Sequence, residues 1–253
     1  MRENKLKAIW ARDEAAVNGW LHIPSSWSAE VMAHAGWDSI TVDMQHGFHN
    51  MESVLQMLQA ISTTDTVPMV RVNWNEPGII MRVLDAGAYG IICPMINTRE
   101  ECEAFVQACR YPPQGIRSLG PTRARVYAGM DYAEHANDTV VTMAMVETQT
   151  AMDNLEAIAS VPGLDGIFVG TGDLRLTMTG GIGFGQDDTV DAALDTILEM
   201  CKKHNLIAGV FTAAPEKARE MIEKGYQFVT VKTDSMLLGE YAAQMIQQTR
   251  PQS

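Results

Sequence analysis

The stretch VVTMAMVETQTAMDNLEAIASVPGLDGIFVGTGD, residues 140–173, has the pattern of a strand, a helix and a second strand. Its two apolar runs, residues 140–146 and 164–170, have the length of buried strands. Between them, residues 150–159 carry apolar side chains at the spacing of one helix face. An acid follows or ends near each run, Glu147 and Asp173. In an α/β enzyme these strand ends are where functional groups are exposed.

The same alternation extends in both directions along the chain. Eight apolar or β-branched runs begin at residues 17, 38, 67, 89, 140, 164, 206 and 226. Helix-like periodicity is found at 28–35, 51–61, 77–86, 99–110, 150–159, 189–204 and 215–224. Gly36, Gly87 and Gly225 follow three of these segments, as left-handed helix ends require. Eight strand–helix units favour a parallel sheet closed into a (β/α)8 TIM barrel, with a doubly wound open sheet as the alternative.

Length and composition favour a single domain over residues 1–253, because 46% hydrophobic content is enough for one large core. The segment KLKAIWARD, residues 5–13, is expected to form a helix that caps the barrel floor. The amphipathic segment at residues 235–250 is expected to pack on the barrel or on a neighbouring subunit. Residues 111–139 form one long connection, which is expected to be functional or to contact a subunit.

The overall charge argues against several classes of partner. A formal charge of -12 would repel nucleic acid and anionic membranes. The N-terminal segment lacks the apolar run of a signal peptide, and nowhere do about 18 apolar residues run together. We therefore expect a cytoplasmic protein with small-molecule substrates. The four cysteines lack C-x-x-C spacing and are expected to be buried thiols.

Polar or aromatic residues lie at or near the ends of the expected strands: Trp20, His22, Asp43, His46, Arg71, Glu147 and Asp173. In a barrel they would all face one opening. Glu147 and Asp173 offer two oxygen ligands, which suits Mg²⁺ or Mn²⁺ with water or substrate completing the coordination. The alternative is a pair of solvated loop acids.

Arg71 lies in the apolar run VPMVRVN and needs an anion, because an unpaired buried charge is strongly unfavourable. That anion could be Asp43, Asp85 or a substrate carboxylate. His46 suits a general base oriented by Asp43 or Asp85, or it could be a loop histidine without a role. With His49 it forms H-x-x-H, but no third zinc ligand lies at a recognisable spacing.

Lys232 ends the eighth expected strand and offers a different chemistry. If burial lowered its pKa, its amine could form a Schiff base with a keto substrate. Alternatively it could form an ion pair with Glu147, Asp173 or Asp234, or extend its ammonium group into solvent at the surface.

The sequence resembles the HpcH/HpaI aldolase family nearly end to end. The resemblance rests on these segments in order: GWLHIPSSWSAEVMAHAGWD, DMQHG, PMVRVNWNEP, LDAGAYGIICPM, RYPPQGIRSLG, VETQTAMDNLEAI and LDGIFVGTGDL. It implies a (β/α)8 barrel that assembles as a homo-oligomer, a trimer or a hexamer of trimer pairs, with the last helix exchanged between neighbours.

The resemblance also implies roles for residues. Glu147 and Asp173 would hold the divalent metal, while Arg71 would bind the pyruvate-type donor and stabilise its enolate. His46, supported by Asp85 and near Asp43, would act through a metal-bound water as the acid and base. The remaining contacts would be a pocket wall at Trp20, backbone groups at Gly170, Thr171 and Gly172 for the donor carboxylate, and Phe211 on the acceptor side.

The function implied is that of a class II aldolase that cleaves 4-hydroxy-2-oxo acids to pyruvate, or hydroxypyruvate, and an aldehyde. Mg²⁺ or Mn²⁺ is the expected metal, with Co²⁺ or Zn²⁺ as further possibilities. Gln45, Thr171–Gly172 and Lys232 depart from the common family pattern and put the acceptor preference in question. Three alternatives remain: a Schiff-base aldolase through Lys232, a citrate-lyase-type enzyme, and a non-catalytic barrel. A citrate-lyase-type enzyme acting on acyl-CoA would need a basic nucleotide-binding footprint, which the sequence lacks.

Overall fold

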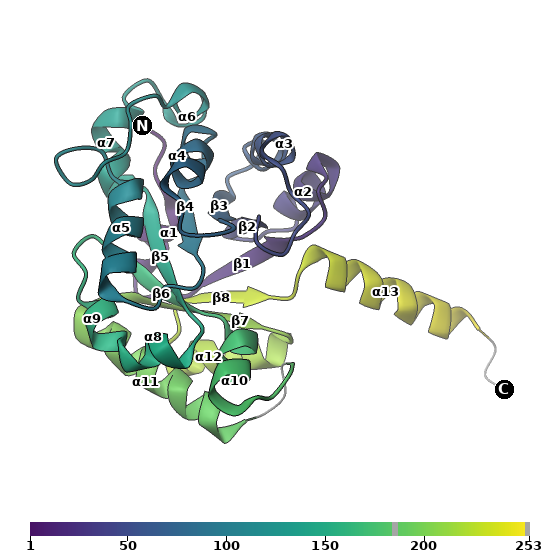
Figure 1. Cartoon of the computed structure of the whole chain (residues 1–253). Helices are drawn as coiled ribbons and strands as arrows, with labels where there is room; N and C mark the ends of the chain where they lie inside the picture. Colours follow the sequence, from purple (N-terminus) through teal and green to yellow (C-terminus); the bar gives the residue numbers. More distant parts are fainter. Residues whose placement is uncertain (184–186, 251–253) are drawn as a thin grey trace.

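Eight parallel strands alternate with helices and close into a barrel in the computed structural model, which describes residues 1–183 and 187–250 (Figure 1). The strands are β1 (Ala16–Leu21), β2 (Ser39–Asp43), β3 (Val67–Arg71), β4 (Gly90–Cys93), β5 (Val141–Val146), β6 (Gly166–Val169), β7 (Ile207–Thr212) and β8 (Phe228–Val231). Each strand pairs with the next, and β1 pairs with β8 to close the ring. The predicted (β/α)8 barrel is confirmed, and the alternative of an open sheet is wrong.

The strands are apolar along nearly their whole length because both of their faces are covered. Side chains on the inner face fill the barrel, where Phe168 lies 5.5 Å from Trp20 and 6.0 Å from Phe228 between ring centroids. Side chains on the outer face pack against the helices in a second, larger apolar cluster. The barrel is therefore a filled core, and space for a ligand is left only at its mouth.

The helices that follow the strands cover the outside of the barrel. They are α2 (Ser26–Ala33), α3 (Met51–Ile61), α4 (Pro77–Asp85), α5 (Arg99–Cys109), α8 (Gln149–Asp153), α9 (Leu155–Ala159), α10 (Thr171–Thr179), α11 (Asp188–His204) and α12 (Pro215–Lys224). Gly36, Gly87 and Gly225 have φ values of 98°, 105° and 117°, as predicted for helix ends. The long connection contains two further helices, α6 (Thr122–Ala128) and α7 (Tyr132–Thr139).

The N-terminal helix α1 (Lys5–Trp10) closes the barrel floor, as predicted. Its capping residue Asn4 donates from Nδ2 to the carbonyl oxygens of Tyr89 and Thr139 at 3.1 and 2.9 Å, next to the amino ends of β4 and β5. Leu6, in the same helix, is fully buried. The floor is thus sealed, and the opposite end of the barrel is the open one.

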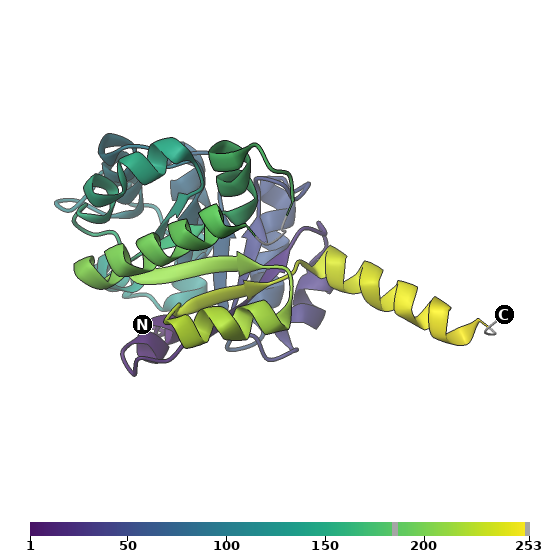
Figure 2. The same ribbon diagram turned by 90° about the horizontal axis from the view of Figure 1, so that it is seen from below.

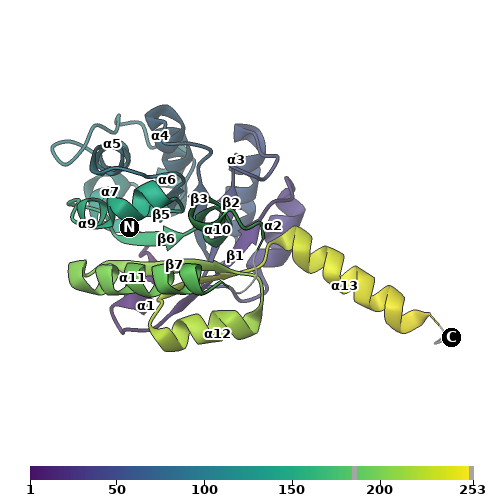
Figure 3. The ribbon, with the colours of Figure 1, turned by 60° about the horizontal axis from the view of Figure 1, so that its bottom comes forward.

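The last helix, α13 (Asp234–Thr249), projects away from the barrel in all three ribbon views (Figures 1, 2 and 3). Asp234 is its only buried residue. The helix therefore does not pack on the barrel of its own chain, which was one of the two expectations. Within the described part of the chain, no helix has the length and apolar character needed to span a bilayer.

Candidate active site

A cavity of about 280 Å³ opens at the carboxyl ends of the strands. Its lining comprises Trp20, His22, His46, Arg71, Met145, Phe168, Gly170, Thr171, Gly172, Asp173, Phe211, Thr233 and Met236. The structure thus brings together most of the residues that the sequence singled out. Two more predicted residues, Asp43 and Glu147, end strand β2 and follow strand β5, where they are completely buried beside the lining residues.

Asp43 is the acceptor at the centre of one wall. Arg71 donates to it twice, from Nε at 2.8 Å and from Nη2 at 2.5 Å. Trp20 Nε1 lies 3.1 Å and His22 Nε2 lies 2.8 Å from Asp43 Oδ2. Burial alone would raise the pKa of Asp43, but the hydrogen bonds from His22, Arg71 and Trp20 and the charge of Arg71 hold that pKa well below its usual range. Asp43 is therefore ionised at neutral pH.

The anion that Arg71 requires is therefore Asp43, one of the three partners considered. The pair is bidentate, which fixes the guanidinium plane. The Arg71 guanidinium also lies 4.9 Å from the ring centroid of Trp20, so cation–π attraction adds to its positioning. Because Arg71 still lines the cavity, its charge reaches a ligand there while its side chain is held rigidly.

The aromatic wall of the cavity is formed by Trp20 and Phe211. Trp20 stacks on Phe168 below it and meets Phe211 edge to face at 5.9 Å between centroids. Phe211 ends near the mouth on β7 and is partly exposed. The predicted wall at Trp20 is thus present, with Phe211 beside it.

Glu147 presents a buried carboxylate with one unused oxygen. Its Oε1 accepts from the backbone N–H of Met95 at 2.7 Å, while Oε2 has no hydrogen-bond partner among residues 1–183 and 187–250. Burial raises the pKa of Glu147 to about 7; the Met95 N–H opposes that shift, and the nearby charge of Asp173 adds to it. A buried acid with an unpartnered oxygen and a second carboxylate close by is a place where a cation would be stabilised.

Asp173 lies in the first turn of α10 and lines the cavity. The two acids fit a hard divalent cation, which accepts carboxylate oxygens and keeps several waters. No group of three or more His, Cys, Asp or Glu residues that could hold a metal occurs among residues 1–183 and 187–250. The protein thus offers two ligands, and the remaining coordination positions would fall to water or substrate.

Gly170 makes room for the Glu147 carboxylate. A Cβ atom at position 170 would lie 2.4 Å from Glu147 Oε2 and 2.6 Å from Met145 Cε. Because both distances are far below van der Waals contact, a side chain at this position would displace the acid. The close approach explains why a glycine stands between β6 and α10, next to Thr171 and Gly172 in the cavity wall.

His46 lines the cavity from the loop after β2, and its own backbone N–H points to Asp43 Oδ1 at 3.4 Å. Gln45 N donates to the same oxygen at 3.0 Å, and Gly47 N donates to the Asp43 carbonyl at 3.1 Å. Asp43 therefore binds the backbone of the loop that carries His46. These contacts do not involve the imidazole ring of His46.

Within the single chain, Asp85 does not line this cavity, so the expected support of His46 by Asp85 is not made there. It ends α4, which starts after β3 and runs back toward the amino end of β4. There Asp85 Oδ1 accepts from Arg117 Nη2 at 2.7 Å and lines a separate surface cavity. A helix in a barrel runs antiparallel to its strands, so the last residue of α4 lies at the opposite end of the barrel from His46.

Lys232 also lies outside the cavity lining. Its ammonium forms an ion pair with Glu240 on α13, so the predicted partners Glu147, Asp173 and Asp234 were wrong. Asp234 instead accepts from the backbone N–H of His22 at 2.8 Å. The lysine amine that the Schiff-base alternative requires is therefore directed toward α13.

The sequence assigned no role to His22, Met145, Phe168, Thr233 or Met236, all of which line the cavity. His22 was recognised as a strand-end residue, because it directly follows β1 as Glu147 follows β5, but this position alone did not indicate a role. The two methionines carry no such signal, since methionine is equally common in apolar cores.

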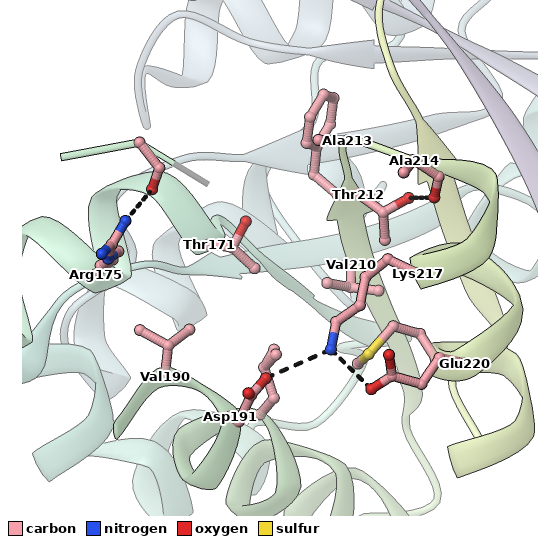
Figure 4. Close-up of a pocket in the computed structure, with 14 residues that line it drawn as sticks. Thr171, Arg175, Val190, Asp191, Val210, Thr212, Ala213, Ala214, Lys217 and Glu220 are labelled. Atoms are coloured by element: carbon pink, nitrogen blue, oxygen red, sulfur yellow. Dashed lines mark hydrogen bonds and ion pairs between the residues drawn. The ribbon is translucent and has the colours of Figure 1, made fainter. Parts of the chain in front are cut away.

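A second cavity of about 250 Å³ lies beside the first and shares Thr171 and Phe211 with it (Figure 4). In Figure 4 the Lys217 ammonium lies between Asp191 and Glu220, at 3.5 and 2.7 Å. Arg175, on the other side, is paired with Asp187 at 3.2 Å. The charged side chains that line the second cavity are thus already in ion pairs, unlike Glu147 Oε2 beside the first cavity.

Comparison with known proteins agrees with this geometry. A family model described as HpcH/HpaI aldolase/citrate lyase matches residues 19–240. A hydroxypyruvate/pyruvate aldolase from Rhizorhabdus wittichii is 37% identical over 254 residues, covering 98% of this chain and 99% of that protein. A 4-hydroxy-2-oxo-heptane-1,7-dioate aldolase from Escherichia coli is 36% identical over 243 residues, covering 95% and 92%.

A solved structure gives the same assignment. A HpcH/HpaI aldolase/citrate lyase family protein from Burkholderia cenocepacia superimposes with a TM-score of 0.92 at 33% identity, covering 98% of this chain and 100% of that one. The resemblance that the sequence motifs indicated is confirmed. The chain belongs to the HpcH/HpaI aldolase/citrate lyase family and is a carbon–carbon lyase.

Proposed function

We propose that this protein is a class II aldolase that cleaves 4-hydroxy-2-oxo acids to pyruvate, or hydroxypyruvate, and an aldehyde. The proposal rests on the buried carboxylate of Glu147, whose Oε2 has no hydrogen-bond partner among the described residues. This carboxylate is close to Asp173 and lies beside the cavity that Arg71 lines. Two acids and one fixed guanidinium suit a substrate with a carboxylate beside a carbonyl. The names of the relatives from R. wittichii and E. coli support the same substrate class.

Different residues of the cavity would bind the substrate, transfer its proton and limit the space around it. Arg71, held flat by Asp43, binds the 2-oxo acid and supplies positive charge where negative charge develops on the C2 oxygen. His46 takes the proton from the C4 hydroxyl as the C3–C4 bond breaks, and in the reverse direction returns it. Trp20 and Phe211 limit the space beside the reacting carbons, and backbone groups of Gly170, Thr171 and Gly172 contact the donor carboxylate.

Glu147 and Asp173 are the residues that would hold a divalent cation, with Mg²⁺ or Mn²⁺ as the preferred ions. When bound, the cation supplies Lewis-acid polarisation of the C2 carbonyl. Glu147 must be ionised to bind it, and the cation in turn compensates the buried charge that Glu147 would otherwise carry alone.

A retro-aldol assay tests the proposal directly. The protein is offered a panel of 4-hydroxy-2-oxo acids, and released pyruvate or hydroxypyruvate is measured with chelator and then with each divalent metal added back. We expect turnover that chelation abolishes and that Mg²⁺ or Mn²⁺ restores. Turnover that survives complete chelation, or no turnover with any 4-hydroxy-2-oxo acid, would contradict the proposal.

The same assay distinguishes the metal-dependent mechanism from a Schiff-base mechanism through Lys232. Lys232→Arg keeps the positive charge opposite Glu240 but removes the primary amine that a Schiff base needs. We expect the variant to retain metal-dependent turnover, and we expect borohydride with pyruvate not to inactivate the parent enzyme. Loss of turnover in Lys232→Arg together with borohydride trapping would favour the rival mechanism.

We propose further that the working form is an oligomer of identical chains. Support comes from α13, which carries exposed Leu238, Tyr241, Met245 and Ile246 beyond the barrel.

A further inference from the structure

His22 is a second imidazole in the cavity, and the proposed function leaves it without a role. It directly follows β1 and lines the same cavity as His46 and Arg71. Its side chain is 30% exposed, whereas the Asp43 carboxylate that it contacts is completely buried. The ring therefore bridges a buried anion and the open space above it.

The hydrogen bond to Asp43 determines which ring nitrogen is free. Nε2 of His22 lies 2.8 Å from Asp43 Oδ2. An ionised carboxylate only accepts hydrogen bonds, so Nε2 of His22 carries a proton; when the ring is neutral, Nδ1 keeps its lone pair. No hydrogen bond from the described parts of the chain reaches Nδ1. His22 thus offers one unused acceptor.

The ring is also held in place from behind. The backbone N–H of His22 donates to Asp234 Oδ1 at 2.8 Å, at the start of α13. Around it stand Asp43 from β2, Arg71 from β3, Asp234 from α13 and His49 from the loop after β2. By contrast, among the described residues the imidazole of His46 has no hydrogen bond. Asp43 therefore orients His22, in the manner of a carboxylate–imidazole dyad.

The order of the strands places His22 opposite the metal-binding acids. In a closed ring of eight strands, β1 is four strands away from β5 in either direction. His22 and Glu147 each follow the end of one of these strands, so they face each other across the mouth. The groups that would hold the 2-oxo acid come from β3, β5 and β6. The wall around His22 is completed by Phe211, Thr233 and Met236 from β7 and the segment after β8.

That wall is largely apolar apart from His22. The hydroxyl of Thr233 is already engaged, at 2.9 Å from Ser235 Oγ and as the acceptor for Met236 N at 3.2 Å. Among the described side chains that line this wall, Nδ1 of His22 is thus an acceptor available to a ligand on the side away from Glu147 and Asp173. A substrate whose 2-oxo acid end is held at those acids would extend its aldehyde-derived half toward His22.

We propose that His22, oriented by Asp43, is a specificity-determining residue that accepts a hydrogen bond from a hydroxyl group on the aldehyde half of the substrate. The inference rests on the proposed aldolase function and adds the acceptor class: hydroxylated aldehydes are preferred over apolar aldehydes of the same size. The ring acts by binding, and no covalent step involves it.

Two aldehydes that differ only by a hydroxyl in place of a methyl test this preference. Glycolaldehyde and propionaldehyde are each added to pyruvate, and the ratio of their kcat/KM values is measured for each enzyme. We expect His22→Phe, which lacks ring nitrogens, to lower the glycolaldehyde preference about tenfold, the upper range for one uncharged hydrogen bond. His22→Leu is the second variant, so that the test does not depend on one substitution folding well.

A rescue variant and a control identify the interaction. His22→Gln carries a donor and an acceptor on one planar amide, and we expect it to retain most of the glycolaldehyde preference. His49→Gln changes a neighbouring histidine that does not line the cavity, and we expect the ratio to be unchanged. A glycolaldehyde preference that persists at the parental value in both His22→Phe and His22→Leu would overturn the proposal.

Failure of the aldolase function itself is recognised separately. Exchange of the C3 protons of pyruvate with deuterium requires the donor site but no aldehyde, and it can be followed by NMR. We expect the parent enzyme to catalyse this exchange in the presence of Mg²⁺. Absence of exchange in the parent would count against the aldolase function, whereas normal exchange with an unchanged aldehyde ratio in the variants would count only against the role of His22.

Discussion

Asp43 is the residue on which the order of the cavity depends most. It accepts from Arg71, Trp20 and His22 while being completely buried, so its loss leaves the Arg71 guanidinium without a counter-charge. We expect Asp43→Asn to destabilise the protein by about 3–5 kcal/mol, as for other broken buried ion pairs. Urea unfolding of the two proteins at pH 7 measures this difference, and a difference below about 1 kcal/mol would contradict it.

The same substitution has a defined pH dependence. The pKa of Asp43 is lowered in the folded protein, so the stability that it contributes is present above its unfolded pKa, near 3.8, and is lost as pH falls through the folded value. We therefore expect the difference between parent and Asp43→Asn to be constant from about pH 8 to pH 5 and to shrink below about pH 4. A difference that instead changes around neutral pH would assign the effect to another group.

Gly170 tests the position of the Glu147 carboxylate. Its φ of -86° suits alanine, so the backbone would accept Gly170→Ala, but the new Cβ would meet Glu147 Oε2 at 2.4 Å. We expect turnover to fall about 100-fold, as misplacement of a reacting group by about 1 Å can cause, while the protein remains folded. The control is Gly239→Ala, where a Cβ meets open space. Equal turnover in Gly170→Ala and the control would contradict this role.

The sequence predicted which residues meet at the mouth of the barrel. The ends of the strands can be located in the sequence, and all parallel strands of a barrel end at the same face. The sequence could not predict which side chains contact each other. Arg71 had three candidate anions, and only the register that pairs Arg71 with Asp43 across β2 and β3 selects one. Lys232 had three candidate acids, and its partner is on α13, eight positions further along the chain.

A capping box in the sequence determines where helix α3, which follows the loop carrying His46, begins. Asn50 Oδ1 accepts from the backbone N–H of Ser53 at 2.8 Å, and Ser53 Oγ accepts from Asn50 N at 3.0 Å, forming a capping box. Because this cap ends the loop that carries His46, we expect Asn50→Ala to cost about 1 kcal/mol of stability. Asn50→Asp retains the acceptor and should cost much less. Thermal or urea unfolding compares the three proteins, and equal stability of Asn50→Ala and the parent would contradict the assignment.

Helices with a clear apolar stripe, such as α3, were predicted from the sequence, whereas α6, α7 and α10 were missed. α3 buries Val54, Met57, Leu58 and Ile61, whereas α10 buries only Leu174. The short helices α6 and α7 bury mainly alanines and one tyrosine, which give little periodic signal. The predicted helix at 150–159 is two helices that meet at Asn154. A helix that buries a continuous apolar stripe is thus easier to predict from its sequence.

For the molecule as a whole, the number of strand–helix units predicted closure, and closure then determined where each residue lies. Asp85 shows the limit of this reasoning. It was considered as a partner of His46 both from the residues and from the family resemblance, but in the single chain it lies at the end of α4 and faces Arg117. Within one chain, strand-end residues gather at the mouth and helix-end residues gather near the floor, so the two sets do not meet.

The last helix makes a prediction about assembly. Leu238, Tyr241, Met245 and Ile246 are spaced along one side of α13, and their side chains are 65, 64, 36 and 53% exposed in the single chain. A helix of 16 residues with so little burial is not stable alone in water, so a second copy of the chain is the natural cover for this stripe. We expect light scattering to give the parent a mass that is a multiple of 27.8 kDa, and we expect the double variant Leu238→Glu, Ile246→Glu to give 27.8 kDa. Gln247→Glu adds a charge on the opposite side of the same helix and should leave the parental mass unchanged. A parent protein that is already 27.8 kDa at micromolar concentration would show that the stripe is not an interface between copies.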